Sequence, residues 1–96
     1  MNLEKIHTSD KNVSAISIFK TDNGTTISIQ IKQGEQLKEH ITKAPALLVC
    51  LNGKALFENE QGLKENLSAG DYIEIEPMVK HWINAIYESN FLLIKS

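Results

Sequence analysis

Apolar residues recur mostly at every second position from Val13 to Ile94, which is the spacing of half-buried strands and not of helices. The segment VSAISIF (13–19) alternates in this way, and TTISIQIK (25–32) sets its isoleucines against serine, glutamine and lysine. Between them, TDNG (21–24) has the composition of a tight turn. We therefore predict a β-hairpin over residues 13–32.

The rest of the chain continues with short alternating segments and frequent turn signals. Asn52-Gly53 predicts a hairpin turn because both residues tolerate a positive φ angle, and Gln61-Gly62 predicts a second one. Residues 77–80 are interpreted as a loop, and ESN (88–90) as a break between two strands. Further strands are predicted at 36–42, 46–51, 54–60, 63–67, 72–76, 81–87 and 91–95.

This pattern of nine or ten short strands is typical of an all-β sandwich or barrel, and it leaves room for a helix only as a turn near Leu3 to His7. The chain of 96 residues has the size of one domain. We expect a single domain over residues 1–96, in which residues 1–12 form an N-terminal arm or an edge strand.

Composition excludes some classes of partner. All ten basic residues are lysines, and they are scattered, so the arginine fork and the basic stripe that favour phosphate binding are absent and we expect no nucleic acid. No segment approaches the roughly 20 apolar residues of a membrane span, and MNLEKIHTSD has no apolar stretch of the secretory type. The single cysteine, Cys50, cannot form an internal disulfide. We therefore expect a cytoplasmic protein with no membrane partner.

Two spaced motifs resemble those of the small single-domain cupins. The first cupin motif reads glycine, five residues, His-x-His, three or four residues, glutamate, six residues, glycine, and Gly34, His40 and Gly53 fall in register with it. The second reads glycine, five residues, Pro-x-Gly, two residues, histidine, three residues, asparagine, and Gly70 and His81 match it. The resemblance covers roughly residues 27–94 and implies an antiparallel jelly-roll, the cupin β-barrel.

The departures from these motifs concern the metal ligands. Metal-binding cupins hold one divalent ion with the two histidines and the glutamate of the first motif and the histidine of the second. Here Thr42 stands at the second histidine position and Ala46 at the glutamate position, so the resemblance leaves only His40 and His81 as metal ligands. The sequence does not identify a cofactor. The resemblance implies a weakly bound divalent transition metal.

Other residues near these motifs are candidates for binding a ligand in the barrel lumen. Lys38, His40 and Thr42 share a strand face, so Lys38 can meet an anionic ligand at the barrel mouth. Cys50 follows Ala46 by four residues on one predicted strand, so both side chains are expected on the same, inward face. An apolar setting there favours inert packing of the Cys50 thiol. The expected ligand-binding set is Lys38, His40, Thr42, Leu48, Cys50, His81 and Ile83.

Each candidate also has an ordinary structural interpretation. His40 and His81 can be polar barrel residues that hydrogen-bond to each other, to Thr42 or to water. Glu74 and Glu76 alternate with isoleucines and are expected on a charged outer face.

Three functions remain open from the sequence. The first hypothesis is a cupin-fold protein that binds a small ligand in the lumen without a full metal centre. The second is a metal-dependent enzyme of the oxygenase or isomerase type with a two-histidine site. The third is a homodimeric interaction module that associates through exposed strand edges and aromatic residues such as Trp82. A homodimer is expected by resemblance, and no substrate or catalytic residue is assigned.

Overall fold

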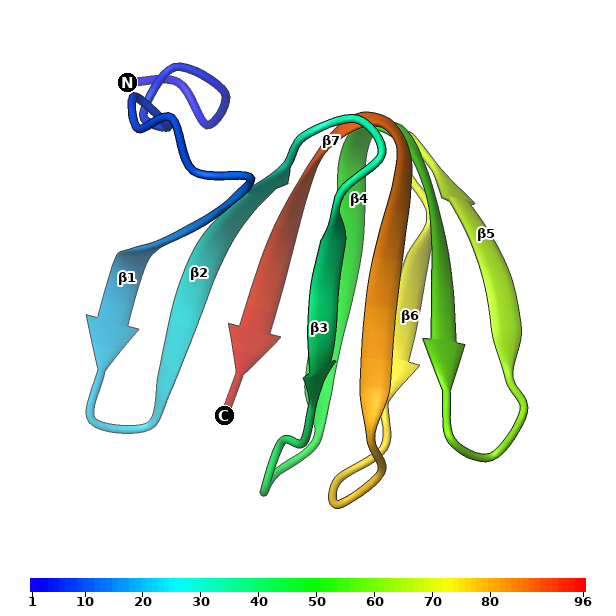
Figure 1. Ribbon diagram of the computed structural model, residues 1–96. Helices are drawn as coiled ribbons and strands as arrows, with labels where there is room; N and C mark the ends of the chain where they lie inside the picture. Colours follow the sequence, from blue (N-terminus) through cyan, green and yellow to red (C-terminus); the bar gives the residue numbers. More distant parts are fainter.

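The computed structural model describes residues 1–96, which form seven antiparallel β-strands and no helix (Figure 1). The all-β antiparallel jelly-roll that the sequence predicts is confirmed. The strands are β1 (Val13–Thr21), β2 (Gly24–Ile31), β3 (Gln36–His40), β4 (Ala46–Asn59), β5 (Lys64–Ser68), β6 (Tyr72–Ile75) and β7 (His81–Lys95). No helix in the structure is long and apolar enough to cross a membrane.

Two long strands, β4 and β7, divide the structure into two sheets. The first sheet has the order β1, β2, second half of β7, first half of β4, and β6. The second has the order β3, first half of β7, second half of β4, and β5. Figure 1 shows β4 and β7 curving over together where they pass from one sheet to the other. Both sheets therefore share the same two central strands.

The bend in β4 lies at Gly53, which packs against Ser89 of β7. Gly53 has φ +88°, and a Cβ at this position would lie 2.7 Å from the Ser89 Cα and still closer to the Ser89 hydroxyl and the Glu88 carbonyl. The ladder between β4 and β7 changes register around Asn52 and Lys54, as expected for a bulge that turns a strand. Glycine is required here because the backbones of the two strands approach too closely for any side chain.

The predicted hairpin at Asn52-Gly53 is therefore wrong, and so is the predicted strand break at 88–90. Both segments lie inside the continuous strands β4 and β7. The positive φ that suggested a reversal of the chain instead allows a bend within a strand, so seven strands take the place of the nine or ten expected. The turns at 21–24 and at Gln61-Gly62 are confirmed as connections between neighbouring strands.

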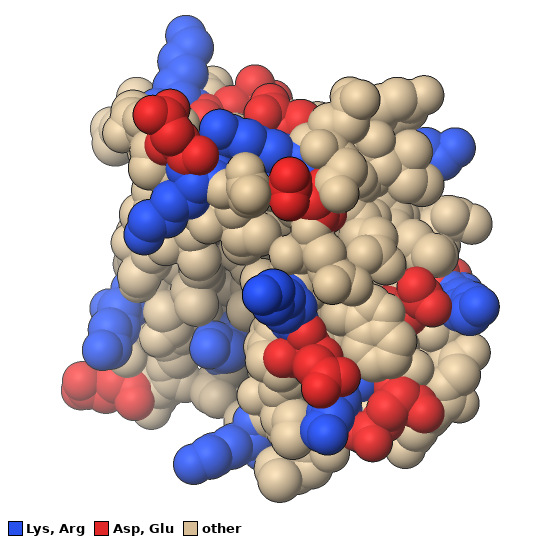
Figure 2. Space-filling model, viewed as in Figure 1, with Lys and Arg blue, Asp and Glu red and all other residues tan.

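The hydrophobic core fills the space between the two sheets. Its largest fully buried apolar side chains are Phe57 from the second sheet and Phe91 from the first. The core residues are Ile29, Ile31, Ala46, Leu48, Cys50, Ala55, Phe57, Leu67, Ile75, Ile83, Ala85, Phe91 and Leu93. On the face shown in Figure 2, charged side chains of both signs are interspersed.

The N-terminal arm, residues 1–12, contains a single turn and no strand. His7 fixes it to the first sheet, since its Nδ1 lies 2.8 Å from the Ser14 hydroxyl and its Nε2 lies 2.9 Å from the Ser28 hydroxyl. Both serines are buried, and partial burial lowers the pKa of His7. His7 is thus a polar anchor for the arm.

Replacing Gly53 by alanine should lower the free energy of unfolding by about 2–5 kcal/mol, because a positive φ and a clash with Ser89 add together. Gly62→Ala is the matched control, since Gly62 has φ +90° with open space around its missing Cβ, and it should lose only about 1–2 kcal/mol. Urea unfolding followed by Trp82 fluorescence measures both. Equal losses of unfolding free energy in the two variants would show that the close contact between β4 and β7 does not require glycine at position 53.

Met78 is the one non-glycine residue with a positive φ, at 65°, and its N–H donates to the Thr42 carbonyl at 2.8 Å. It occupies the position at which the second cupin motif has glycine. Met78→Gly should therefore raise the free energy of unfolding by about 0.5–1 kcal/mol, because strain is relieved at some cost in chain entropy. Leu63→Gly, at an exposed position without positive φ, should lower the same quantity; a loss in both variants would contradict the prediction.

Candidate functional site

The pairing of β3 with β7 places His40 directly opposite His81. Their Nε2 atoms lie 3.1 Å apart, and the ring centroids are separated by 4.3 Å with the rings inclined at 62°. His81 is only 2% exposed, whereas His40 is half-buried. The two motif histidines, 41 residues apart in the sequence, therefore form one hydrogen-bonded pair.

Backbone carbonyls hold the other nitrogen of each ring. The Nδ1 of His40 lies 3.0 Å from the Lys38 oxygen, and the Nδ1 of His81 lies 3.4 Å from the Val79 oxygen. Phe57 stacks on His81 at a centroid distance of 5.6 Å. The orientation of His81 is thus fixed by an aromatic face, a carbonyl and the second histidine.

This environment disfavours a positive charge on His81. Burial lowers the pKa of the His81 imidazole below its usual 6.5, the proximity of His40 lowers it further, and the Val79 carbonyl opposes this in part. His81 is therefore neutral at pH 7 and available as a hydrogen-bond donor or acceptor.

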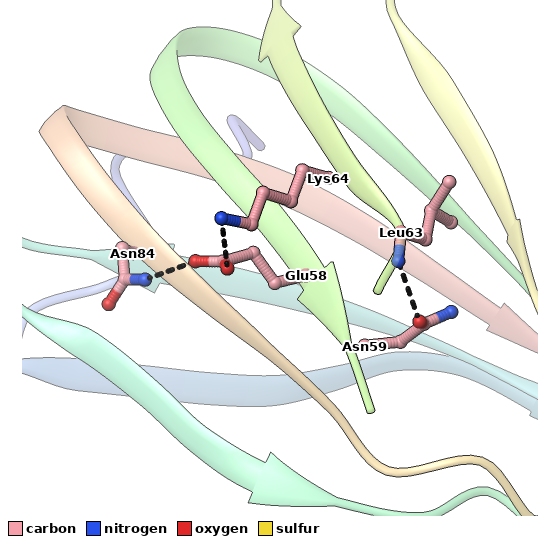
Figure 3. Close-up of polar contacts among 5 residues, drawn as sticks. All are labelled: Glu58, Asn59, Leu63, Lys64 and Asn84. Atoms are coloured by element: carbon pink, nitrogen blue, oxygen red, sulfur yellow. Dashed lines mark hydrogen bonds and ion pairs between the residues drawn. The ribbon is translucent and has the colours of Figure 1, made fainter. Parts of the chain in front are cut away.

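A hollow of about 480 Å³ lies beside His81, between the β4–β5 turn and the end of β6. The turn is shaped by Asn59, whose Oδ1 accepts a hydrogen bond from the Gln61 N–H. It also accepts one from the Leu63 N–H (Figure 3). The walls are formed by Phe57, Asn59, Gln61, Gly62, Leu63, Glu74, Ile75, Glu76, Val79 and His81.

Three residues expected to contact a lumen ligand lie in the packed core. Leu48, Cys50 and Ile83 are at most 1% exposed, and none of them lines the hollow. Burial raises the pKa of the Cys50 thiol, and Asp71 raises it further, against the opposing hydrogen bond to the Asn52 carbonyl. Cys50 is accordingly a core side chain with its thiol protonated.

The expectation that Lys38 shares a face with His40 is wrong. The pairing of β3 with β7 changes register between Leu37 and His40, so Leu37 opposite Ile83 and His40 opposite His81 both face inward. This irregularity breaks the simple alternation and leaves the Lys38 side chain exposed, outside the hollow. Lys38 contributes only its backbone carbonyl, which accepts the hydrogen bond from His40.

The remaining donor positions do not fit the metal centre of the cupin motif. Thr42 is buried, and its Oγ1 has no hydrogen-bond partner in the protein. Ala46, at the carboxylate position, packs in the core. No group of three or more histidine, cysteine, aspartate or glutamate side chains converges anywhere in the chain. Two nitrogens are therefore all that this chain offers to a metal ion at the motif site.

Several residues of the hollow are not predicted by the sequence. Glu74 and Glu76 are exposed, as expected, but they also form part of its wall. Phe57 has no predicted role beyond its strand, although its spacing from Asn59 puts both on the inward side. The proline at position 77, two residues after the end of β6, is the available signal that the chain turns here beside Glu74 and Glu76.

Comparisons with known proteins agree with this architecture. No protein-family model and no curated protein matches the sequence. Among solved structures, a double-stranded β-helix protein from Klebsiella pneumoniae has a TM-score of 0.87 at 14% identity, over 100% of this chain and 87% of its own. An RmlC-like cupin from Desulfovibrio desulfuricans gives 0.86 at 18% identity, over 99% and 92%.

A cupin superfamily protein from Desulfitobacterium hafniense has a TM-score of 0.85 at 18% identity, over 97% of this chain and 84% of its own. At these identities the likeness concerns the fold, and it agrees with the all-β antiparallel architecture. The chain is a small domain with the cupin fold.

Proposed function

We propose that this protein binds a small organic molecule in the hollow beside His81, without a full metal centre. The observation that carries the proposal is the buried His81, hydrogen-bonded to the half-buried His40, at the wall of a hollow of about 480 Å³. Small-molecule sites are typically hollows of about 300–1,000 Å³ with apolar walls and a few placed polar groups. The hollow has this size, and four of its ten wall residues are hydrophobic.

The walls also favour a class of ligand. Phe57, Ile75 and Val79 offer apolar surface, whereas Glu74 and Glu76 contribute carboxylates and no lysine lines the hollow. An anion would be repelled by these carboxylates, and a cation would be attracted. We therefore expect a neutral or positively charged molecule with an apolar body, in place of the anionic ligand that Lys38 suggested.

The proton count of the histidine pair supports a role in recognition. Three contacts need a hydrogen, namely those to the Lys38 and Val79 carbonyls and the one between the rings, but two neutral imidazoles carry only two. The shortest carbonyl contact assigns one proton to His40 Nδ1, so His81 Nε2 donates to His40 Nε2. The Nδ1 of His81 then has no hydrogen to donate to the Val79 carbonyl at 3.4 Å, and it is the one ring nitrogen of the pair left as a free acceptor.

A metal-dependent enzyme of the oxygenase or isomerase type is the second candidate. One observation favours it: two Nε2 atoms 3.1 Å apart are spaced like two ligands of one ion with bonds of about 2.1 Å. Each ring would also donate its Nδ1–H to a carbonyl, which is the usual arrangement of metal-bound histidine. The missing third ligand counts against it.

Thermal-shift screening with neutral and cationic small molecules should find ligands that raise the melting temperature by several degrees at saturating concentration. Leu63→Trp, which fills the hollow, should abolish the shift, because Leu63 lines its wall. Ile86→Trp is the matched control, since Ile86 is an exposed apolar residue outside the hollow, and should leave the shift intact. Hits that shift both variants equally would contradict binding in the hollow.

The same screen should include Mn²⁺, Fe²⁺, Ni²⁺ and Zn²⁺, with His40→Gln and His81→Gln as variants. We expect organic ligands to act without added metal. A stabilisation that appears only with a metal ion, and disappears in both histidine variants, would replace the first candidate by the second.

The free energy of unfolding should decrease as the pH falls from 7.5 to 5. The pKa of His81 is lowered in the folded protein, so between pH 6.5 and that lowered pKa the unfolded chain binds more protons than the folded one. The free energy of unfolding therefore falls with decreasing pH, by at most about 1.4 kcal/mol per pH unit for this one group. An NMR titration of the His81 ring should give a midpoint below 6.5. His7 is the other histidine with a lowered pKa, so the variant His7→Gln separates its contribution to the pH dependence from that of His81. A titration midpoint of His81 above 6.5 would contradict the prediction.

A further inference from the structure

A row of polar side chains crosses the outer face of the first sheet. The pairing of β1, β2, β7 and β4 aligns Ser14, Gln30, Asn90 and Asn52 in this row. The Gln30 amide donates to the Asn90 Oδ1 at 3.2 Å, and the Asn90 amide donates to the Asn52 Oδ1 at 2.9 Å. Asn90, in the middle of the row, is only 3% exposed. A chain of side-chain amides therefore links three neighbouring strands.

The N-terminal arm is attached to both ends of this row. His7 contacts the Ser14 hydroxyl on β1, and the Glu4 carboxylate accepts a hydrogen bond from the Asn52 amide on β4. Asn2 helps to position Glu4, because its Oδ1 accepts a hydrogen bond from the Glu4 N–H at 2.9 Å. The arm thus lies across the outer face of the sheet, with one contact on the edge strand and one on a central strand.

The Glu4 carboxylate fixes the direction of the whole chain of amides. A carboxylate is only an acceptor, so Asn52 presents its Nδ2 to Glu4 and its Oδ1 to Asn90. An aspartate at position 52 would also be only an acceptor. It would keep the hydrogen bond from Asn90, but its charge would lie against the Glu4 carboxylate, and the two would repel each other. Only the contact with the arm therefore requires an amide at position 52.

Asn52 is followed by glycine, the neighbour that hinders loss of a side-chain amide least. In this reaction the backbone nitrogen of the next residue attacks the side-chain carbonyl carbon, and ammonia leaves with the proton of that N–H. Water then opens the cyclic imide to aspartate or isoaspartate. Gly53 is exposed and has no partner in the ladders that β4 forms with β5 and β7. The Asn52 amide must leave Asn90 and Glu4 before it can turn to the Gly53 nitrogen, so both contacts oppose the reaction.

We propose that Asn52 is a modification site, at which hydrolysis of the side-chain amide to a carboxylate detaches the N-terminal arm from β4. The coupling acts in both directions. The docked arm slows the reaction by holding the amide, and the carboxylate that forms weakens docking by repelling Glu4. The step consumes water and releases ammonia, so it is a one-way change. It is independent of ligand binding in the hollow, because neither Asn52 nor Glu4 lines that hollow.

A second Asn-Gly pair in the chain provides an internal comparison. Asn23-Gly24 lies where β1 turns into β2. Asn23 is exposed, whereas Asn52 is half-buried and its amide is held on both sides. In the folded protein, Asn23 should therefore lose its amide before Asn52 does.

Incubation of the folded protein at mildly alkaline pH, followed by mass spectrometry of the peptides that contain each asparagine, measures both rates in one sample. Glu4→Ala should raise the rate at Asn52 at least about 10-fold, as expected for loss of one hydrogen bond to a charged group, and should leave the rate at Asn23 unchanged. Asp10→Ala is the matched control, since it removes an exposed carboxylate from the same arm, and it should change neither rate. An unchanged rate at Asn52 in Glu4→Ala would overturn the proposal.

Release of the arm is tested with Asn52→Asp, which reproduces one product of the reaction. Limited cleavage by trypsin after Lys5 reports the detached arm, because cleavage follows the population of the open form. The rate should be at least about 10-fold higher in Asn52→Asp than in wild type, again as expected for the loss of one charged hydrogen bond. Asn23→Asp makes the same exchange in the turn and should be cleaved like wild type.

A rescue variant separates release of the arm from a general loss of folding. Glu4→Gln in the Asn52→Asp background should restore slow cleavage, because a glutamine amide can donate to the new carboxylate. Each rate is divided by that of a free peptide of residues 1–12 with the same arm sequence, which removes the effect of position 4 on trypsin itself. Wild-type cleavage of Asn52→Asp, or fast cleavage that Glu4→Gln does not reverse, would overturn the proposal.

Discussion

The close contact between Gly53 and Ser89 is the constraint on which the rest of the structure depends. The Ser89 Oγ accepts a hydrogen bond from the Lys54 N–H at 3.0 Å and donates to the Tyr87 carbonyl at 2.7 Å, so it satisfies backbone groups where the ladder is interrupted. A side chain at position 53 would separate the strands at this point. Because β4 and β7 bend here together, a chain of 96 residues encloses a core between two sheets.

The bend also assembles the candidate site. Beyond it, the first half of β7 lies between β3 and the second half of β4, so His81 pairs with His40 on one side and with Asn59 on the other. Phe57, two residues before Asn59, then stacks on the His81 ring. The histidine pair and the wall of the hollow are therefore consequences of the same strand crossing that closes the core.

Local sequence signals predicted the strands well but could not predict which strands are continuous. Asn52-Gly53 indicates a positive φ correctly, yet that angle is equally compatible with a hairpin and with a bulge inside β4. The choice is made by Ser89, which lies far away in the sequence on β7. The outward position of Lys38 is of the same kind, because the irregularity in β3 that separates it from His40 is defined by the pairing with β7 and not by the alternation of β3 itself.

This chain keeps two histidines of the cupin ligand set and lacks the other two ligands. Met78 has a positive φ at the position where the motif has glycine, and its N–H donates to the carbonyl of Thr42, which stands at a motif histidine position. Ala46 adds apolar surface to the core where a carboxylate would need a charged partner. The fold thus forms without the donors of the motif, and the polar groups that remain at the motif site are the His40–His81 pair and the Thr42 hydroxyl.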